Sequence, residues 1–115
     1  MLVKIFDHEE LINYFTEVNN YVNYKYLLIN NATLVNIGVV LIKSIIEKYQ
    51  YPLDYIIIDC KNSIAYCIFA LENNFKYMLL DCNNSEVEAN INNLAMQNKG
   101  YIFNNEEKII EYFVN

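Results

Sequence analysis

Two acidic residues follow two apolar segments and are the first candidates for chemistry. Asp59 ends the segment of residues 55–58, and Asp81 ends that of residues 77–80. If these segments are neighbouring strands in register, the two carboxylates lie within several ångströms of each other. Such a pair either resists joint ionisation or holds a hard cation such as Mg²⁺ through its oxygen atoms. In the alternative, which we favour, each carboxylate accepts hydrogen bonds from the N–H groups of its own turn.

The turns that contain these acids repeat the pattern Asp-Cys-x-Asn-Ser, at residues 59–63 and 81–85. Ligands of open parallel sheets bind outside the carboxyl ends of the strands, where both turns are expected to lie. The amide and hydroxyl side chains there, with one Asn after the preceding strand, extend the candidate ligand-binding set. The set comprises Asn31, Asp59, Asn62, Ser63, Asp81, Asn84 and Ser85.

The same repeat places Cys60 and Cys82 at equivalent positions. Adjacent parallel strands would bring their sulfur atoms close enough for a disulfide or a shared metal. However, the chain has no Cys-x-x-Cys pair and a single histidine, so a zinc site lacks ligands. We therefore expect free, buried thiols, with Cys67 in the core. An odd number of cysteines favours reduced thiols in a bacterial cytoplasm.

His8, at the start of the first predicted helix, is the remaining catalytic candidate. A lone histidine in a first helical turn is usually solvated, and no serine is placed beside it for a catalytic triad. With two glycines in the chain, neither a phosphate-binding loop nor a dinucleotide fingerprint is present. We expect no nucleotide cofactor, and Mg²⁺ remains the one cofactor that the acidic pair would accommodate.

Five short apolar segments that alternate with helical patterns position these candidates. The predicted strands are residues 2–6, 24–29, 55–60, 75–81 and 101–103. Helix starts are predicted at polar residues that cap N-termini. The predicted caps are Asp7, Thr33, Ser63, Ser85 and Asn104. The inward faces of three of the helices are predicted to be Leu11, Phe15, Val18 and Val22; Val87, Ile91, Leu94 and Ala95; and Ile109, Ile110 and Phe113.

This alternation predicts one domain, residues 1–115, with an α/β fold. Strands joined by helical crossovers pair in parallel, and apolar strands need helices on both faces. We predict a three-layer sandwich of about five mainly parallel strands, flavodoxin-like or Rossmann-like. Lys4 makes the first strand a poor central strand, so a STAS-like mixed sheet with that strand at an edge is the alternative.

The composition excludes several classes of partner. The net charge is −6, all eight basic residues are lysines, and no basic cluster occurs. Nucleic acids and anionic membranes are therefore disfavoured. The longest unbroken apolar stretch has eight residues, 64–71, which is too short to span a membrane. The first residues run directly into a charged segment, so we expect a cytoplasmic protein without a signal peptide.

Two families share parts of this pattern. Asp59, at the end of a third strand, resembles the phosphoacceptor of response-regulator receiver domains, and Asp7 resembles an acidic residue after their first strand. The chain departs from that family at Asn104, where a receiver has lysine. The second half, from Asp59 to Phe113, is similar to STAS domains, which bind protein partners, with Ser63 near their regulated serine.

Two functional hypotheses follow. The first is a small non-catalytic interaction or regulatory domain that binds a protein partner or itself, for which the 55% apolar content and the cluster of Tyr21, Tyr24 and Tyr26 argue. The second is a small-molecule or divalent-metal-dependent enzyme that uses Asp59, Asp81 and His8 at the strand ends.

Overall fold

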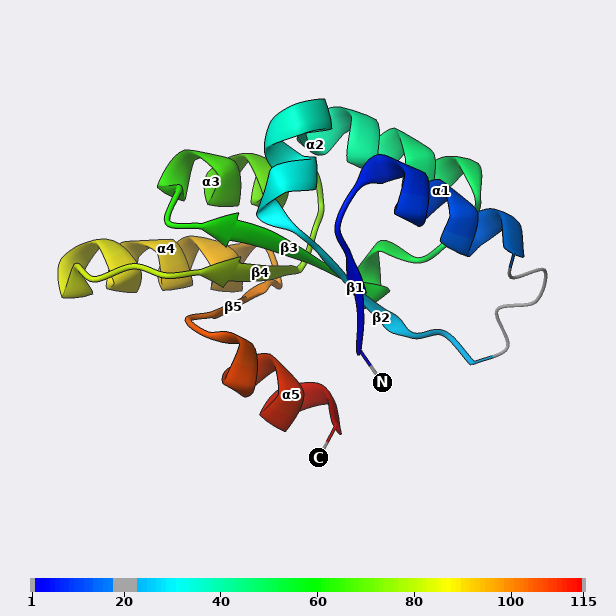
Figure 1. Ribbon diagram of the computed structural model, residues 1–115. Coiled ribbons are helices and arrows are strands. Elements are labelled where there is room, and N and C mark those ends of the chain that lie inside the picture. Colours follow the sequence, from blue (N-terminus) through cyan, green and yellow to red (C-terminus); the bar gives the residue numbers. More distant parts are fainter. Residues whose placement is uncertain (1, 18–22, 115) are drawn as a thin grey trace.

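The computed structural model describes residues 2–17 and 23–114 and has one five-stranded sheet that alternates with helices (Figure 1). All strand pairs are parallel, in the order β1-β2-β3-β4-β5. This confirms the predicted three-layer α/β fold in the flavodoxin-like and Rossmann-like range. The strands are β1 (Leu2–Ile5), β2 (Tyr26–Ile29), β3 (Ile56–Lys61), β4 (Tyr77–Leu80) and β5 (Tyr101–Phe103). The helices are α1 (His8–Glu17), α2 (Asn31–Lys48), α3 (Ile64–Glu72), α4 (Ser85–Gln97) and α5 (Glu106–Val114), with a 3₁₀ turn η1 (Leu53–Tyr55).

The two helical layers are unequal. Helices α1 to α4 pack on one face of the sheet, where Leu11, Ile42, Cys67 and Ile91 share a core with the strands. Helix α5 alone packs on the other face, where Ile109 joins a smaller core (Figure 1). Right-handed crossovers between strands that follow one another across a sheet all fall on the same face. The sequential strand order therefore accounts for the unequal layers.

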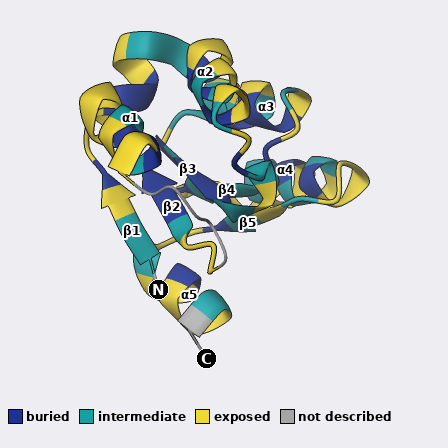
Figure 2. Cartoon of the chain, turned by 90° about the vertical axis from the view of Figure 1, so that its right-hand side faces the viewer, coloured by how far each residue is buried: buried dark blue, intermediate teal, exposed yellow. Residues whose placement is uncertain are grey.

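The middle of the sheet is the segment that the sequence marked as buried on both faces. Ile56, Ile57 and Ile58 are fully buried in β3, which lies between β2 and β4. β3 and β4 are parallel neighbours, as the candidate site required. Each helix turns its buried residues toward the sheet and its exposed residues outward (Figure 2).

The first strand lies at an edge, as the alternative topology proposed. The side chain of Lys4 lies on the face of the sheet that α5 covers, and its ammonium group forms an ion pair of 2.9 Å with Glu106 of α5. The sheet is parallel throughout its described strands, so the mixed sheet of that alternative is not realised.

Two predicted helix starts are confirmed. The N–H of Glu10 donates to Asp7 Oδ1 at 2.9 Å, and the N–H of Tyr66 donates to Ser63 Oγ at 3.3 Å. At each site a short polar side chain satisfies an N–H group that the first helical turn leaves without a partner.

The other three predicted caps are wrong, because a nearby asparagine takes the capping position. Asn30 replaces Thr33, Asn84 replaces Ser85, and Asn105 replaces Asn104. The carboxamide oxygen of asparagine caps at least as well as a hydroxyl group, so the earlier residue starts the helix. Thr33 is instead buried inside α2, where its Oγ1 has no hydrogen-bond partner in the described structure.

Both glycines have a structural reason. Gly38 bends α2 with φ of +84°, a conformation that other residues adopt with strain. A Cβ at Gly100 would lie 2.9 Å from the carbonyl oxygen of Lys76. The chain can therefore bring β5 against β4 only with glycine at this position.

Most of the predicted inward residues are confirmed within the described residues. Leu11, Phe15, Ile91, Ala95 and Ile109 are buried. Ile110 is wrong, since its side chain is 48% exposed on the outer side of α5. Val18 and Val22, predicted for the first helix, lie outside the described residues. Among the described helices, none combines the length and apolarity that a membrane crossing requires.

Candidate functional site

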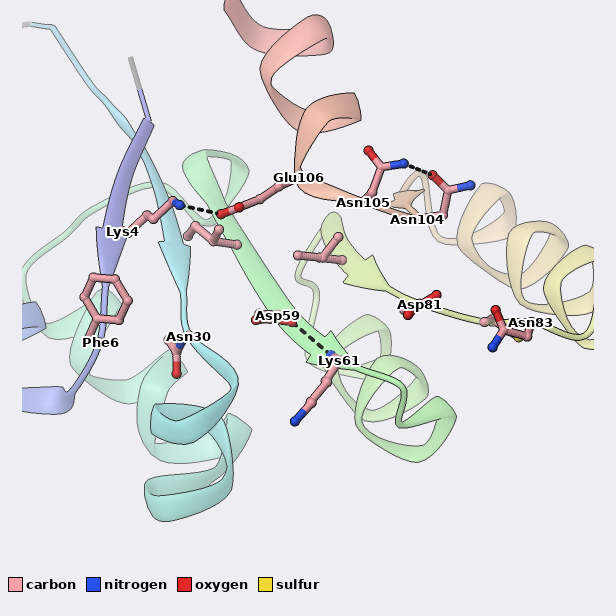
Figure 3. A pocket seen from close by; sticks show the side chains of 13 residues that line it. Lys4, Phe6, Asn30, Asp59, Lys61, Asp81, Asn83, Asn104, Asn105 and Glu106 are labelled. Carbon is pink, nitrogen blue, oxygen red and sulfur yellow. Dashed lines mark hydrogen bonds and ion pairs between the residues drawn. The ribbon is translucent and has the colours of Figure 1, made fainter.

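A cleft of about 780 Å³ opens at the carboxyl ends of the strands, on the face that α5 covers (Figure 3). Its walls come from every strand end and from the start of α5. Leu28 and Leu79 form an apolar floor, and polar side chains form the rim. The lining residues are Lys4, Phe6, Leu28, Asn30, Asp59, Lys61, Leu79, Asp81, Cys82, Asn83, Asn104, Asn105 and Glu106.

The cleft brings the two predicted acids into one site, with different roles. Asp59 is half-buried, and its Oδ1 accepts the N–H of Lys61 at 2.9 Å (Figure 3). This bond supports the favoured interpretation, in which the carboxylate stabilises its own turn. The turn needs support, because Lys61 has φ of +56°.

Asp81 is offset from Asp59 along the sheet. In the pairing of β3 with β4, Asp59 lies beside Leu79, and Lys61 lies beside Leu80 because the register shifts between Asp59 and Lys61. Asp81 comes after Leu80 and therefore lies beyond the level of Asp59. Asp81 is exposed, and its backbone N–H donates to the carbonyl oxygen of Lys61 at 2.7 Å. The two carboxylates therefore belong to one cleft at different levels, rather than to directly opposed positions.

An ion pair crosses the cleft from one edge of the sheet. Lys4 of β1 and Glu106 of α5 approach each other to 2.9 Å (Figure 3). Both side chains are about half exposed, so the pair is worth less than about 1 kcal/mol. It links the start of α5 to the edge strand β1.

The other predicted ligand-binding residues shape the turns without lining the cleft. The carboxamide nitrogen of Asn31 donates to the carbonyl oxygen of Asp59 at 3.0 Å and so ties α2 to β3. Ser63 and Asn84 cap α3 and α4. Asn62 and Ser85 are exposed.

Sequence reasoning missed the cleft residues contributed by the strands themselves. Lys4, Leu28 and Leu79 face the cleft because they share one face of the sheet. The alternation of side chains along each strand could have shown that these residues lie on one face of the sheet. It could not show that only α5 covers this face, because that depends on the strand order. Asn30, next to the predicted Asn31, and Asn104, predicted as a helix cap, also line the cleft.

The third catalytic candidate, His8, does not join these acids. His8 is exposed on α1 and is not a lining residue. No group of three His, Cys, Asp or Glu side chains that would hold a metal ion occurs within residues 2–17 and 23–114.

The three cysteines are free thiols. Cys60 and Cys67 are fully buried between β3 and α3, and Cys82 is half-buried at the cleft. Hydrogen bonding to Cys67, followed by burial, raises the pKa of the Cys60 thiol. The thiols are free as predicted, and the predicted burial is confirmed for Cys60 but wrong for Cys82.

Aromatic side chains fill the space between α5 and the sheet. The ring of Phe113 packs against Tyr26 and Tyr77, with centroids 3.8 and 4.9 Å away. Burial, and then the nearby Tyr112, raise the pKa of Tyr77 to about 12. Tyr24 packs against Tyr51 at 5.3 Å, and Tyr21, the third member of the predicted cluster, lies outside the described residues.

A second hollow of about 450 Å³ runs beside β5, the other edge of the sheet. Its apolar lining includes Met96 of α4, which is 73% exposed, and Tyr101, which is 49% exposed. The ring of Tyr101 also packs against that of the exposed Tyr112 of α5, with centroids 5.2 Å apart. We call Met96, Tyr101, Ile102 and Tyr112 the β5 strip.

Comparison of the chain with protein-family models, with curated proteins and with solved structures finds no match.

Proposed function

We propose that this chain is a small, non-catalytic interaction or regulatory domain of the cytoplasm that binds a protein partner or a second copy of itself. The observation that carries the proposal is the β5 strip, which combines an open strand edge with exposed apolar side chains. Large exposed apolar patches rimmed by polar residues are typical of protein interaction sites.

The backbone of β5 supports this proposal. The N–H of Tyr101 donates to the carbonyl oxygen of Lys76, next to β4. In a parallel pair, alternate residues of a strand bond to the neighbouring strand, so the N–H and C=O of Ile102 point away from β4. An unpaired edge of this kind is a template for another strand, and its neighbouring side chains select the partner. At the opposite edge, the corresponding strand carries Lys4, a charge of the type that discourages strand pairing.

The cleft supports the non-catalytic part of the proposal. Asp59 stabilises its own turn, Glu106 is paired with Lys4, and His8 lies outside the cleft. General acid–base catalysis requires a proton donor or acceptor held within hydrogen-bond reach of a substrate. The polar groups of this cleft are better explained by helix capping and turn formation.

A second candidate function uses the cleft directly. Its volume of about 780 Å³ lies within the range of small-molecule sites, and both Asp59 and Asp81 line it. In this case the chain would bind a small polar molecule or Mg²⁺ at the strand ends. A titration with Mg²⁺ followed by thermal melting tests this, because a cation that binds only the folded state raises the melting temperature. The Asp59→Asn variant is the control that removes a charge and keeps the shape.

Site-specific photo-cross-linking in cells tests the interaction proposal. A photoreactive phenylalanine analogue replaces Tyr101, and the same analogue replaces the exposed Asn13 on α1 as the control. We expect a discrete cross-linked species from position 101 and none from position 13. The absence of any adduct at position 101, in a chain that remains folded, contradicts the proposal.

A further inference from the structure

We propose that the partner of the β5 strip is a second copy of this chain, joined by antiparallel pairing of the two β5 strands about a two-fold axis at Ile102. The inference rests on the proposed interaction function and names its partner. The result would be one continuous sheet across two protomers.

The backbone geometry of β5 suits this pairing. With Ile102 on the axis, its outward N–H and C=O exchange two hydrogen bonds with the partner's Ile102. β5 has only three residues, so backbone bonds contribute little and side chains must supply the rest. Tyr101 of one protomer then lies directly opposite Phe103 of the second copy, and the reverse pair forms on the other side of the axis. Both pairs lie on the face of the sheet that carries α5.

The exposed apolar residues lie where such a dimer needs them. Met96 lines the hollow on the side of β5 that α4 covers, and Tyr101 lies on the side that α5 covers. Two-fold symmetry presents each of these side chains to the partner's β5 edge. The apolar surface of one protomer is thereby covered by the same surface of the other, as in an isologous interface.

The charges along the edge are complementary only for an antiparallel partner. The carboxyl end of β5 is acidic, with Glu86 and Glu88 in the first turn of α4 and Glu107 in the first turn of α5. The amino end carries Lys99, which is exposed. An antiparallel copy places each basic end against the acidic end of its partner, whereas a parallel copy would oppose like charges. Lys108 moderates the acidic end and is itself 3.6 Å from Glu111.

Sedimentation velocity over a series of protein concentrations gives the first test. We expect a reversible dimer of twice 13.6 kDa that weakens as salt is added. The Met96→Asp variant should shift the dimer to monomer. Val40→Asp, at a comparably exposed apolar residue on α2, is the matched control and should leave the dimer intact. Met96 and Val40 are both more than half exposed, so neither change removes core packing.

Charge exchange gives the second test. Lys99→Glu and Glu88→Lys should each weaken self-association at least tenfold, because each places like charges across the axis. An equimolar mixture of the two variants should restore a dimer, since both charge pairs of the heterodimer are again opposite. Restoration on mixing is not expected from loss of folding.

The outcomes separate this inference from the proposed function. A wild-type monomer at all concentrations overturns the dimer. If position 101 nevertheless cross-links to a protein of different mass, the interaction function stands and its partner is another chain. A dimer that dissociates on Val40→Asp but not on Met96→Asp overturns the placement at β5.

Discussion

The two Asp-Cys-x-Asn-Ser turns contain the same residue types but have different structures. In the first turn, β3 continues to Lys61, and Cys60 is completely buried. In the second turn, β4 ends at Leu80, and Cys82 is half-buried at the cleft. The residue types are therefore insufficient to set the environment of either thiol.

The difference has its origin in the neighbouring strands. β3 has a partner on each side, and its pairing with β4 shifts between Asp59 and Lys61. That shift adds a residue to the first turn and turns Lys61 into the left-handed region. The second turn starts instead with a hydrogen bond that the N–H of Asp81 donates to the carbonyl oxygen of Lys61. The second turn is thus built on the end of the first, and the repeat is not symmetric.

Thiol reactivity should show the largest difference between the turns. Cys82 should react readily with an aromatic disulfide reagent, because its side chain is accessible at the cleft. Cys60 has no exposed surface, and its pKa is raised by Cys67 and by burial. Cys60 should react only after local opening of the structure, at a rate about 1,000-fold below that of Cys82. Mass spectrometry of the labelled chain checks this, and equal rates at both thiols would contradict the assigned environments.

The raised pKa of Cys60 also predicts the sign of a pH effect. A thiol with a raised pKa in the folded state stabilises the fold fully below its unfolded pKa, and this contribution is lost as the pH rises. Cys60 should therefore lower the free energy of unfolding above about pH 8.5, the ordinary pKa of cysteine. The hydrogen bond with Cys60 lowers the pKa of Cys67, and this opposes part of the decrease. Denaturant titrations between neutral and alkaline pH measure it, with Cys60→Ala as the variant that should lose part of the decrease.

Serine substitution of the two cysteines should have the next largest effect. Cys60→Ser buries a hydroxyl group in the apolar core and should lower the free energy of unfolding by about 2 kcal/mol. Cys82→Ser, at a site in contact with water, should change it by less than about 0.5 kcal/mol. Urea titrations of both variants test the contrast. A loss at Cys82 equal to that at Cys60 would mean that the second turn is as buried as the first.

The sequence was sufficient to predict the order and type of the elements, because each strand is a short apolar run between polar turns. It also predicted that β3 and β4 are buried parallel neighbours and that Asp59 and Asp81 share one end of the sheet. These predictions depend on periodicity and on connection length, both of which are local properties of the chain.

The remaining features depend on contacts between elements that are distant in the sequence. The sequential strand order put four helices on one face, which left Lys4 and Leu79 to line the cleft. The caps shifted by up to three residues because Asn30, Asn84 and Asn105 competed with the predicted residues. Ile110 was assigned inward because the sequence does not show that α5 rests on the sheet along one narrow side.

Capping substitutions should have a smaller effect and should distinguish the two serines that were both predicted as helix caps. Ser63→Ala and Asn84→Ala each remove an accepted N–H bond and should lower the free energy of unfolding by about 1 kcal/mol. Ser85→Ala, within the first turn of α4, should be neutral. Thermal melting of the three variants measures this, and a loss at Ser85 equal to that at Ser63 would restore the symmetric interpretation of the repeat.

The acids should show the smallest difference. Asp59→Ala removes the acceptor for the N–H of Lys61 and should lower the free energy of unfolding by about 0.5 kcal/mol, whereas Asp81→Ala should leave it unchanged. Chemical denaturation at neutral pH compares the two. If removing Asp81 instead raises stability, and removing Asp59 does the same, the carboxylates repel each other across the cleft. Their proximity would then be maintained at a cost that turn formation does not explain, and the ligand-binding function would become the stronger proposal.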